Sequence, residues 1–417
     1  MTRHRRTLIT LGGVLVVGTS IFGVKTLLWP RGSTAQKTCA QVSKQDVTER
    51  LEVLGEPFKT GKYAKVQPYA RNVWAMYPFQ RQVYLGHGDS NRNQGPIPLW
   101  FFNPQSRQFK FDFVAPEEQI RNFQAIGSSL YIPGIDARGS WKFGNFYRRR
   151  QQGWQKIRTI PGGVHVWSIQ GFKNQLWTAI RRQDNRGYLL RSANRGRTWQ
   201  EVQTLRTDPA RLVRFEASLY VFSGGPPWQV DATLSPRQRP DLDRTTLFPD
   251  HKQATQVTKT ATYKSQLAYL SNVSRYVART SRNTKVLNSE DPHLHPPGLF
   301  VAQSLEPNNA KVRRIQLPTN EVPWDLWATQ QGLYVLTSDR QQGSGQQRFV
   351  NRIRKATDQQ HWCEILTFES ETFARSFTQL QGHWYFGLGT DYGQEYGRKS
   401  YTQRAHPQSG TILRTQL

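Results

Sequence analysis

Acidic side chains, cysteine and methionine are all scarce in this sequence of 417 residues. The chain has two cysteines, which excludes a protein stapled by several disulfide bonds and a zinc module built from cysteine ligands. Asp and Glu together number 29 against 57 Lys and Arg, so the formal net charge is +28. Hydrophobic residues make up 36% of the chain and aromatic residues 12%. This content excludes a disordered polyelectrolyte and predicts a packed core.

Long apolar runs are also missing, except near the N-terminus. Residues 8–29 form one apolar run behind the cationic start 1–6, broken only by small or hydroxyl residues and Lys25. A helix of about 22 residues spans roughly 33 Å, which is enough to cross a bilayer. The cations before it should stay in the cytoplasm, so the rest of the chain is expected outside it. We assign residues 1–35 to a retained signal-anchor or to a signal peptide cleaved before Gln36, and the sequence leaves both open.

Cys39 and Cys363 are expected to form a disulfide bond, because an exported protein folds where disulfides persist. The bond would tie the stalk that follows the membrane segment, residues 36–62, to a late part of the folded domain. The alternative is a pair of buried thiols. The folded domain itself is assigned to residues 63–417.

A β-rich repeat runs through this domain. Short runs with an aromatic residue at the centre recur between clusters of Gly, Pro, Asn and Asp, and their centres lie about 43 to 65 residues apart. This period is typical of propeller blades. The central aromatic residues are Tyr84, Tyr131, Trp177, Tyr220, Tyr269, Tyr334 and Tyr385.

A second short run precedes each centre by about ten residues, as at 73–76 and 166–169, and predicts the innermost strand of each blade. We therefore predict an all-β, seven-bladed β-propeller. Residues 255–317 form a stretched and weakly patterned unit, so six blades with an insertion is an alternative, and two separate β-domains are a rival. Residues 49–54 and 410–414 are expected to pair in one blade, which would close the ring and remove an exposed sheet edge.

One motif carries a family resemblance. Residues 192–199 read Ser-Ala-Asn-Arg-Gly-Arg-Thr-Trp between two expected strands. The segment resembles the Asp-box, or bacterial neuraminidase repeat, with Asn194 in place of the aspartate. The resemblance implies a sialidase-like propeller in which the box is a folding hairpin remote from any active site.

Catalytic motifs are not found. The sequence contains no Gly-x-Ser-x-Gly elbow, no His-Glu-x-x-His helix and no phosphate-binding Gly-Lys-Ser/Thr loop. We therefore predict no catalytic residue, metal or cofactor. A glycan-active, sialidase-like hydrolase or lyase is kept as the alternative function.

Polar residues follow the expected second strands at similar spacing, and rotation of the blades would bring them to one mouth of the ring. Such a mouth could hold a ligand, although an Asp in a loop often only fixes its own turn. The candidate ligand-binding residues are His87, Asp89, Asn93, Asp136, Arg138, Trp141, His165, Asp339, Asp391 and Tyr392.

The positive charge predicts attraction to polyanions. An exported domain seldom meets nucleic acid, and no nucleic-acid recognition fold is visible, so none is expected as a partner. The expected partners are a glycan, an acidic polymer or an envelope protein, together with an anionic membrane surface and the membrane that holds the N-terminal helix. The function predicted from sequence is a non-catalytic binding or scaffold module of the cell envelope.

Overall fold

The structure is a computed structural model. It describes residue 39 and residues 42–59, 68–89, 95–135, 139–151, 153–205, 209–251, 254–273, 277–280, 283–286, 297–341, 348–358, 361–390 and 406–416. The expected N-terminal membrane or signal segment, residues 1–35, lies outside these ranges. Within them, no helix has both the length and the apolar composition needed to cross a bilayer.

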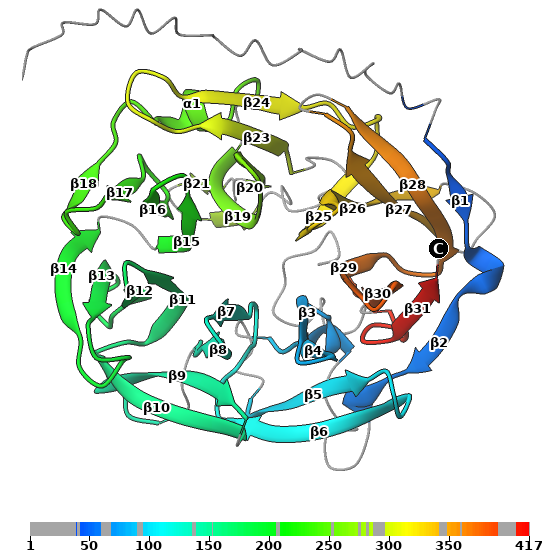
Figure 1. The fold of residues 1–417 in the computed structure, drawn as a ribbon, viewed down its shortest axis with the longest axis horizontal. Coiled ribbons are helices and arrows are strands. Elements are labelled where there is room, and N and C mark those ends of the chain that lie inside the picture. Colours follow the sequence, from blue (N-terminus) through cyan, green and yellow to red (C-terminus); the bar gives the residue numbers. More distant parts are fainter. Residues whose placement is uncertain are drawn as a thin grey trace, which may run out of the picture. The chain divides into compact units, whose positions relative to one another are not determined.

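Seven antiparallel sheets stand around one axis, each contributing its first strand to the centre and its last to the rim (Figure 1). The first three blades are β3–β6 (Ala75–Phe79, Gln82–Gly86, Ile97–Asn103, Gln108–Ala115), β7–β10 (Gln124–Ile126, Ser129–Pro133, Phe143–Arg150, Gly153–Pro161) and β11–β14 (His165–Phe172, Gln175–Arg181, Gly187–Ser192, Gln200–Leu205). The fourth is β15–β18 (Pro209–Phe215, Ser218–Ser223, Trp228–Val230, Pro236–Gln238), and the fifth is β19, β20, β23 and β24 (Ala254–Tyr263, Gln266–Val273, Leu299–Ser304, Lys311–Ile315). The sixth is β25–β28 (Val322–Thr329, Gly332–Gln341, Arg348–Ala356, Trp362–Ser370), and the seventh joins β29–β31 (Ala374–Leu380, His383–Leu388, Ile412–Gln416) to β2 (Glu52–Gly55).

The repeated aromatic residue lies in the second strand of every blade, as the period predicts. All seven are buried, and none is more than 5% exposed. Side chains on the two faces of a blade pack against those of the adjacent blades: Tyr84 and Tyr147, for example, share one cluster across blades one and two. The seven-bladed propeller is therefore confirmed.

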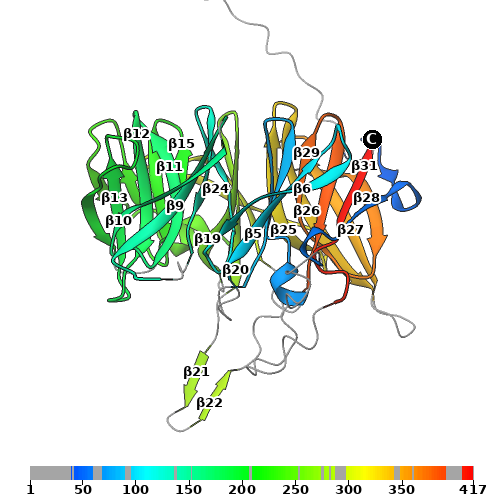
Figure 2. The same ribbon diagram turned by 90° about the horizontal axis from the view of Figure 1, so that it is seen from below.

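The stretched fifth unit is a blade with an insertion. Between β20 and β23 the chain forms a separate two-stranded hairpin, β21 (Val277–Thr280) and β22 (Asn283–Val286). Figure 2 shows this hairpin projecting from one end of the ring. The long step in the repeat thus reflects an inserted hairpin, and the six-bladed alternative is wrong.

Both ends of the domain close the seventh blade. In β2, Glu52 and Val53 pair with Arg414 and Leu413 of β31. The Arg414 guanidinium contacts the Glu52 carboxylate, and Arg107 of blade one reaches the same carboxylate. The predicted pairing of residues 49–54 with residues 410–414 is confirmed, and the closing strand is also held to the first blade by an ion pair.

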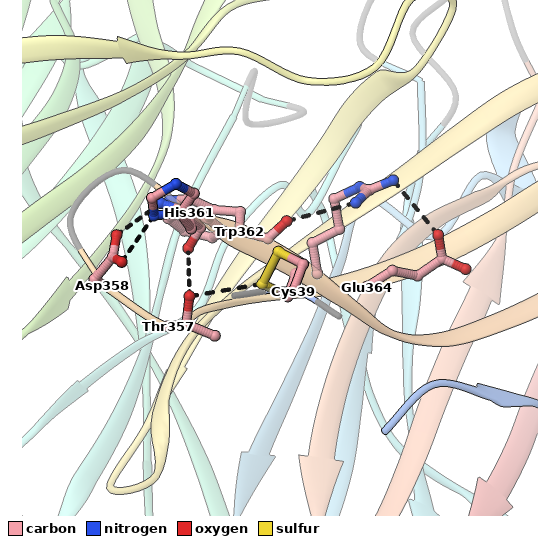
Figure 3. The surroundings of a disulfide bond; sticks show 8 residues. Cys39, Thr357, Asp358, His361, Trp362 and Glu364 are labelled. Carbon is pink, nitrogen blue, oxygen red and sulfur yellow. Dashed lines mark hydrogen bonds and ion pairs between the residues drawn. A yellow bond between two sulfur atoms is a disulfide. The ribbon is translucent and has the colours of Figure 1, made fainter. Parts of the chain in front are cut away.

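The disulfide bond between Cys39 and Cys363 is present, with the two Cα atoms 5.1 Å apart (Figure 3). Cys363 is buried in β28, the outer strand of the sixth blade. Just after Cys39, the short strand β1 (Gln45–Asp46) adds to the same edge in parallel, with Gln45 opposite Leu366. The segment that precedes the ring-closing strand is therefore fixed to blade six by a covalent bond and by strand pairing.

The bond links residues 324 positions apart, so it restricts the unfolded chain strongly. We expect Cys39→Ser/Cys363→Ser to lower the free energy of unfolding by about 2–5 kcal/mol in a denaturant titration. A reductant should lower the denaturant midpoint of the wild-type protein to about that of the variant. It should leave the midpoint of the variant unchanged. Equal midpoints for the oxidised and reduced wild-type protein would contradict this expectation.

Candidate functional site

The mouth is the end of the ring at which every second strand ends and every first strand begins. It is the end from which β21 and β22 project in Figure 2. His87 and Asp89 follow β4, Asp339 lies near the end of β26, and Trp141 lies between β8 and β9. His165 begins β11 at the same end. The structure thus brings these five predicted residues to one end of the ring.

Backbone hydrogen bonds join the mouth loops of the first three blades. The Asp89 amide donates to the Glu118 carbonyl at 3.0 Å, and the Val166 amide donates to the Gly134 carbonyl at 2.9 Å. Gly88 makes this close packing possible, because a Cβ on it would lie 2.5 Å from the Glu118 carbonyl oxygen and its φ is +116°. The floor of the mouth is therefore fixed by main-chain contacts.

Two of the predicted residues are part of this floor. His87 is fully buried against Phe58, with ring centroids 3.9 Å apart, and its two ring nitrogens lie 3.2 Å and 2.9 Å from the carbonyl oxygens of Ala70 and Pro98. Asp89 is 2% exposed. Their side chains pack beneath the mouth surface, so a role in ligand contact stays a prediction.

The other described candidates differ in exposure. Trp141 is 43% exposed and Asp339 is half-buried in β26. His165 is buried, and its ring stacks in parallel on Trp167 at 4.8 Å. Five further candidates lie outside the described residues: Asn93, Asp136, Arg138, Asp391 and Tyr392.

The mouth also contains residues that we expected only as parts of strands. In six blades, the residue ten positions before the central aromatic stands near the start of the innermost strand or just before it, and in the fifth blade it stands midway along β19. Six of the seven blades carry Trp, Arg or Lys there, and the fourth has Ala210 followed by Arg211. We call six of these residues the axial set: Trp74, Arg121, Trp167, Lys259, Trp324 and Arg375. Aligning the repeats on their aromatic residues would have found this set from sequence.

Indoles and guanidinium groups alternate in the axial set. The Arg375 guanidinium lies 3.8 Å from the ring centroid of Trp74 and 5.6 Å from that of Trp324. The Arg121 guanidinium lies 5.5 Å from the Trp74 ring on the other flank. Trp167 follows, with its carbonyl oxygen accepting from Asn122 at 3.2 Å. Blades six, seven, one, two and three therefore present Trp, Arg, Trp, Arg and Trp in order, all half-buried.

The remaining blades add charge to the same region. Lys259 lies 3.0 Å from the Asp325 carboxylate and donates to the Trp74 carbonyl at 2.8 Å, which links blade five to blades six and one. Arg211 donates to the Thr258 carbonyl. Burial lowers the pKa of Arg211 to about 10; Asp325 opposes this shift and Arg121 adds to it. Burial also lowers the pKa of Lys259, with Arg211 and Arg375 acting in the same direction against the attraction of Asp325.

One tyrosine–glutamate pair bears on the hydrolase alternative. The Tyr147 hydroxyl donates to the Glu117 carboxylate at 2.7 Å, a pairing that a sialidase-like nucleophile would need. Both side chains are fully buried. Burial and the adjacent carboxylate raise the pKa of Tyr147, which opposes formation of a phenolate nucleophile. This pair is therefore part of the packing between blades one and two.

The turn at residues 192–199 is held by its own side chains. Asn194 Oδ1 accepts from the Thr198 amide at 2.9 Å, and Ser192 Oγ accepts from the Gly196 amide at 2.8 Å. Trp199 Nε1 donates to Thr159 Oγ1 of the adjacent blade at 3.1 Å. The turn joins β13 to β14 at the end of the ring opposite the mouth. Its Asp-box kinship stays a prediction.

A wide depression of about 1290 Å³ also lies at that opposite end. It is lined by the turns between first and second strands, including Lys173 and Glu216, and by Arg150, Arg195 and Arg214. The sequence predicts no ligand site there. Substitutions in this depression can serve as controls for substitutions at the mouth.

Comparison with known proteins shows the fold alone. No protein-family profile matches the sequence, and no curated protein is similar to it. Among solved structures, U3-55K is similar with a TM-score of 0.50 and 11% identity, over 88% of this chain and 99% of that one. A chain of the mitotic checkpoint complex gives a TM-score of 0.49 at 9% identity, over 89% of this chain and 94% of that one. The Pan2 WD40 domain of Neurospora crassa gives 0.48 at 11% identity, over 82% and 94%.

The buried imidazole of His87 predicts acid sensitivity. Burial lowers its pKa to about 4, against about 6.5 in an unfolded chain. The unfolded state therefore binds more protons between these values, and the free energy of unfolding falls as the pH is lowered through this range. We expect His87 to account for a loss of roughly 2 kcal/mol between pH 7 and pH 4.5. His165, whose burial lowers its pKa to about 3, acts in the same direction.

Urea titrations at the two pH values should show that His87→Gln has a smaller pH dependence than the wild-type protein. The matched control is His383→Gln, at the start of β30 and at the opposite end of the ring. It should keep the wild-type dependence. If His87→Gln keeps the wild-type pH dependence of the free energy of unfolding, the His87 imidazole is not the cause of the acid sensitivity.

Proposed function

We propose that the protein is an exported, membrane-tethered β-propeller that acts as a non-catalytic binding or scaffold module of the cell envelope, with its ligand held at the mouth. The axial set carries this proposal. Half-buried indoles and cations from six blades meet around one axis, although they are up to about 300 residues apart in sequence. Aromatic side chains together with a few polar or charged groups are the side chains that commonly line ligand sites.

Binding is favoured over hydrolysis by the state of three acidic groups at the mouth end. Asp325 is buried in an ion pair with Lys259, and Glu117 is buried with Tyr147. Asp184, which follows the second strand of blade three, accepts from the Arg186 amide at 3.0 Å and so fixes its own turn. A glycoside hydrolase needs two carboxyl groups facing the substrate at a defined separation. These three acids have structural roles instead.

The Cys39–Cys363 disulfide supports export, because such bonds persist in oxidising compartments and are rare in the cytosol. The cationic start and apolar run in residues 1–35 support the same location and a membrane tether. In this setting the net charge of +28 favours acidic polymers and anionic lipid surfaces as neighbours. The Asp-box resemblance supports a distant relation to sialidase-like propellers, without their chemistry.

Export is tested in spheroplasts that express the full chain. We expect added protease to digest the propeller while a cytoplasmic marker survives. Leu15→Arg places a charge in the apolar run and should leave the propeller protected, because a charged residue opposes membrane insertion. Protection of the wild-type propeller until the cells are lysed would contradict export.

Ligand binding at the mouth is tested with the full chain on arrays of envelope glycans and envelope proteins. We expect saturable binding without release of products. Arg375→Ala should weaken it at least tenfold, because this guanidinium contacts two indoles of the axial set. Arg214→Ala, in the opposite depression, is the matched control. Loss of binding in the control alone, or release of cleaved glycan, would contradict the proposal.

A further inference from the structure

The alternation of indoles and guanidinium groups in the axial set restricts the chemistry of its ligand. Arg375 lies between Trp74 and Trp324, and Arg121 lies on the other flank of Trp74. A guanidinium group binds a carboxylate through two parallel N–H donors. An anion held by Arg375 would therefore lie beside an indole.

The charges of the region favour an anion. Arg121, Arg211, Lys259 and Arg375 contribute four positive charges, and Asp325 contributes one negative charge through its contact with Lys259. Asp325 is already satisfied by Lys259 and by the Phe377 amide at 3.3 Å. Arg211 and Arg121 repel each other, as do Lys259 and Arg375. A bound carboxylate would relieve this repulsion in a partly buried site, where charges interact more strongly than in water.

The indoles specify what the carboxylate is attached to. An indole offers a flat apolar surface with one N–H donor. In Trp74 and Trp324 this donor is used within the protein, at 2.8 Å from the Gly88 carbonyl oxygen and 2.6 Å from Ser338 Oγ. The indole nitrogens are thus fixed. One face of the Trp324 ring stacks on Phe373, with ring centroids 4.0 Å apart, and the Arg375 guanidinium lies 3.8 Å from the Trp74 centroid. A ligand would therefore contact the ring surface that these two side chains leave uncovered. A saturated sugar ring has a face of C–H groups that fits such a surface, and its hydroxyl groups can bond to polar groups around it.

We propose that the axial set recognises an acidic saccharide, with the carboxylate of a uronic-acid ring on Arg375 and the ring face on an adjacent indole. This inference rests on the proposed function and names the class of ligand for the same site. An acidic peptide offers the carboxylate without a rigid apolar face. A single-stranded nucleic acid offers a flat base and a phosphate. The acidic peptide and the nucleic acid are therefore the two alternative ligands that the experiment must exclude.

The experiment is calorimetric titration of the full chain with four probes: trigalacturonate, the neutral galactose trisaccharide, hexaglutamate and a hexathymidylate. We expect trigalacturonate to bind at least tenfold more tightly than each of the others, and its affinity to fall with salt as charged contacts are screened. Arg375→Gln should reduce the affinity at least tenfold. Arg375→Lys, which keeps the charge but not the planar fork, should give an intermediate loss. Arg214→Gln should leave the affinity unchanged, and thermal unfolding should show that all variants fold.

Three results would overturn the inference. Equal binding of the neutral trisaccharide, or tighter binding of hexaglutamate or hexathymidylate, would exclude an acidic saccharide. If Arg375→Gln weakens the binding of that other probe, the mouth remains the ligand site and the proposed function stands. Trigalacturonate binding that Arg214→Gln removes and Arg375→Gln does not would reject both the ligand class and the mouth. If no probe binds, the ligand class is wrong, and the array experiment decides separately whether the mouth binds anything.

Discussion

The pairing of β2 with β31 is the interaction on which the rest of the structure depends. Seven sheets that pack face to face in a row leave one uncovered face at each end, and without β2 the seventh sheet would end at β31, with an unpaired edge of the kind that is prone to aggregation. By taking its outer strand from the beginning of the domain, the last blade meets the first, and Glu52 contacts both Arg414 and Arg107 across the junction. The disulfide and β1 fix the preceding segment to blade six. Closure therefore involves three successive blades.

Once the ring is closed, equivalent positions in different blades face one axis. A residue ten positions before each buried aromatic then becomes a neighbour of its counterparts in adjacent blades. This geometry explains how Trp74 and Arg375, about 300 residues apart in sequence, come within cation–π distance. The same closure brings Lys259 of blade five to Asp325 and to the Trp74 carbonyl. The chemistry of the mouth is thus a consequence of the repeat together with its closure.

Sequence reasoning predicted the architecture well because the aromatic period is a packing requirement: each blade needs a large side chain in its second strand to fill the space between sheets. The closing strands and the disulfide followed from the edge problem and from having only two cysteines. The site was harder to predict. His87 is a polar residue after a strand, but it is buried because Phe58, from outside the repeat, covers it. The sequence predicts Trp74 and Arg375 in or beside innermost strands, but the strand pattern of a single blade does not show which of their side chains meet those of adjacent blades.

The measurement that tests this account most directly is a spin-label distance across the closing strands. Val53 is 67% exposed in β2, and Gln416 is exposed at the end of β31. Val53 pairs with Leu413, three residues from Gln416, so the two labelled Cα atoms should lie roughly 11 Å apart. We expect the Val53→Cys/Gln416→Cys protein, labelled with its native disulfide intact, to show strong dipolar broadening of its EPR spectrum. A spectrum equal to the sum of the two singly labelled proteins would contradict closure of the ring.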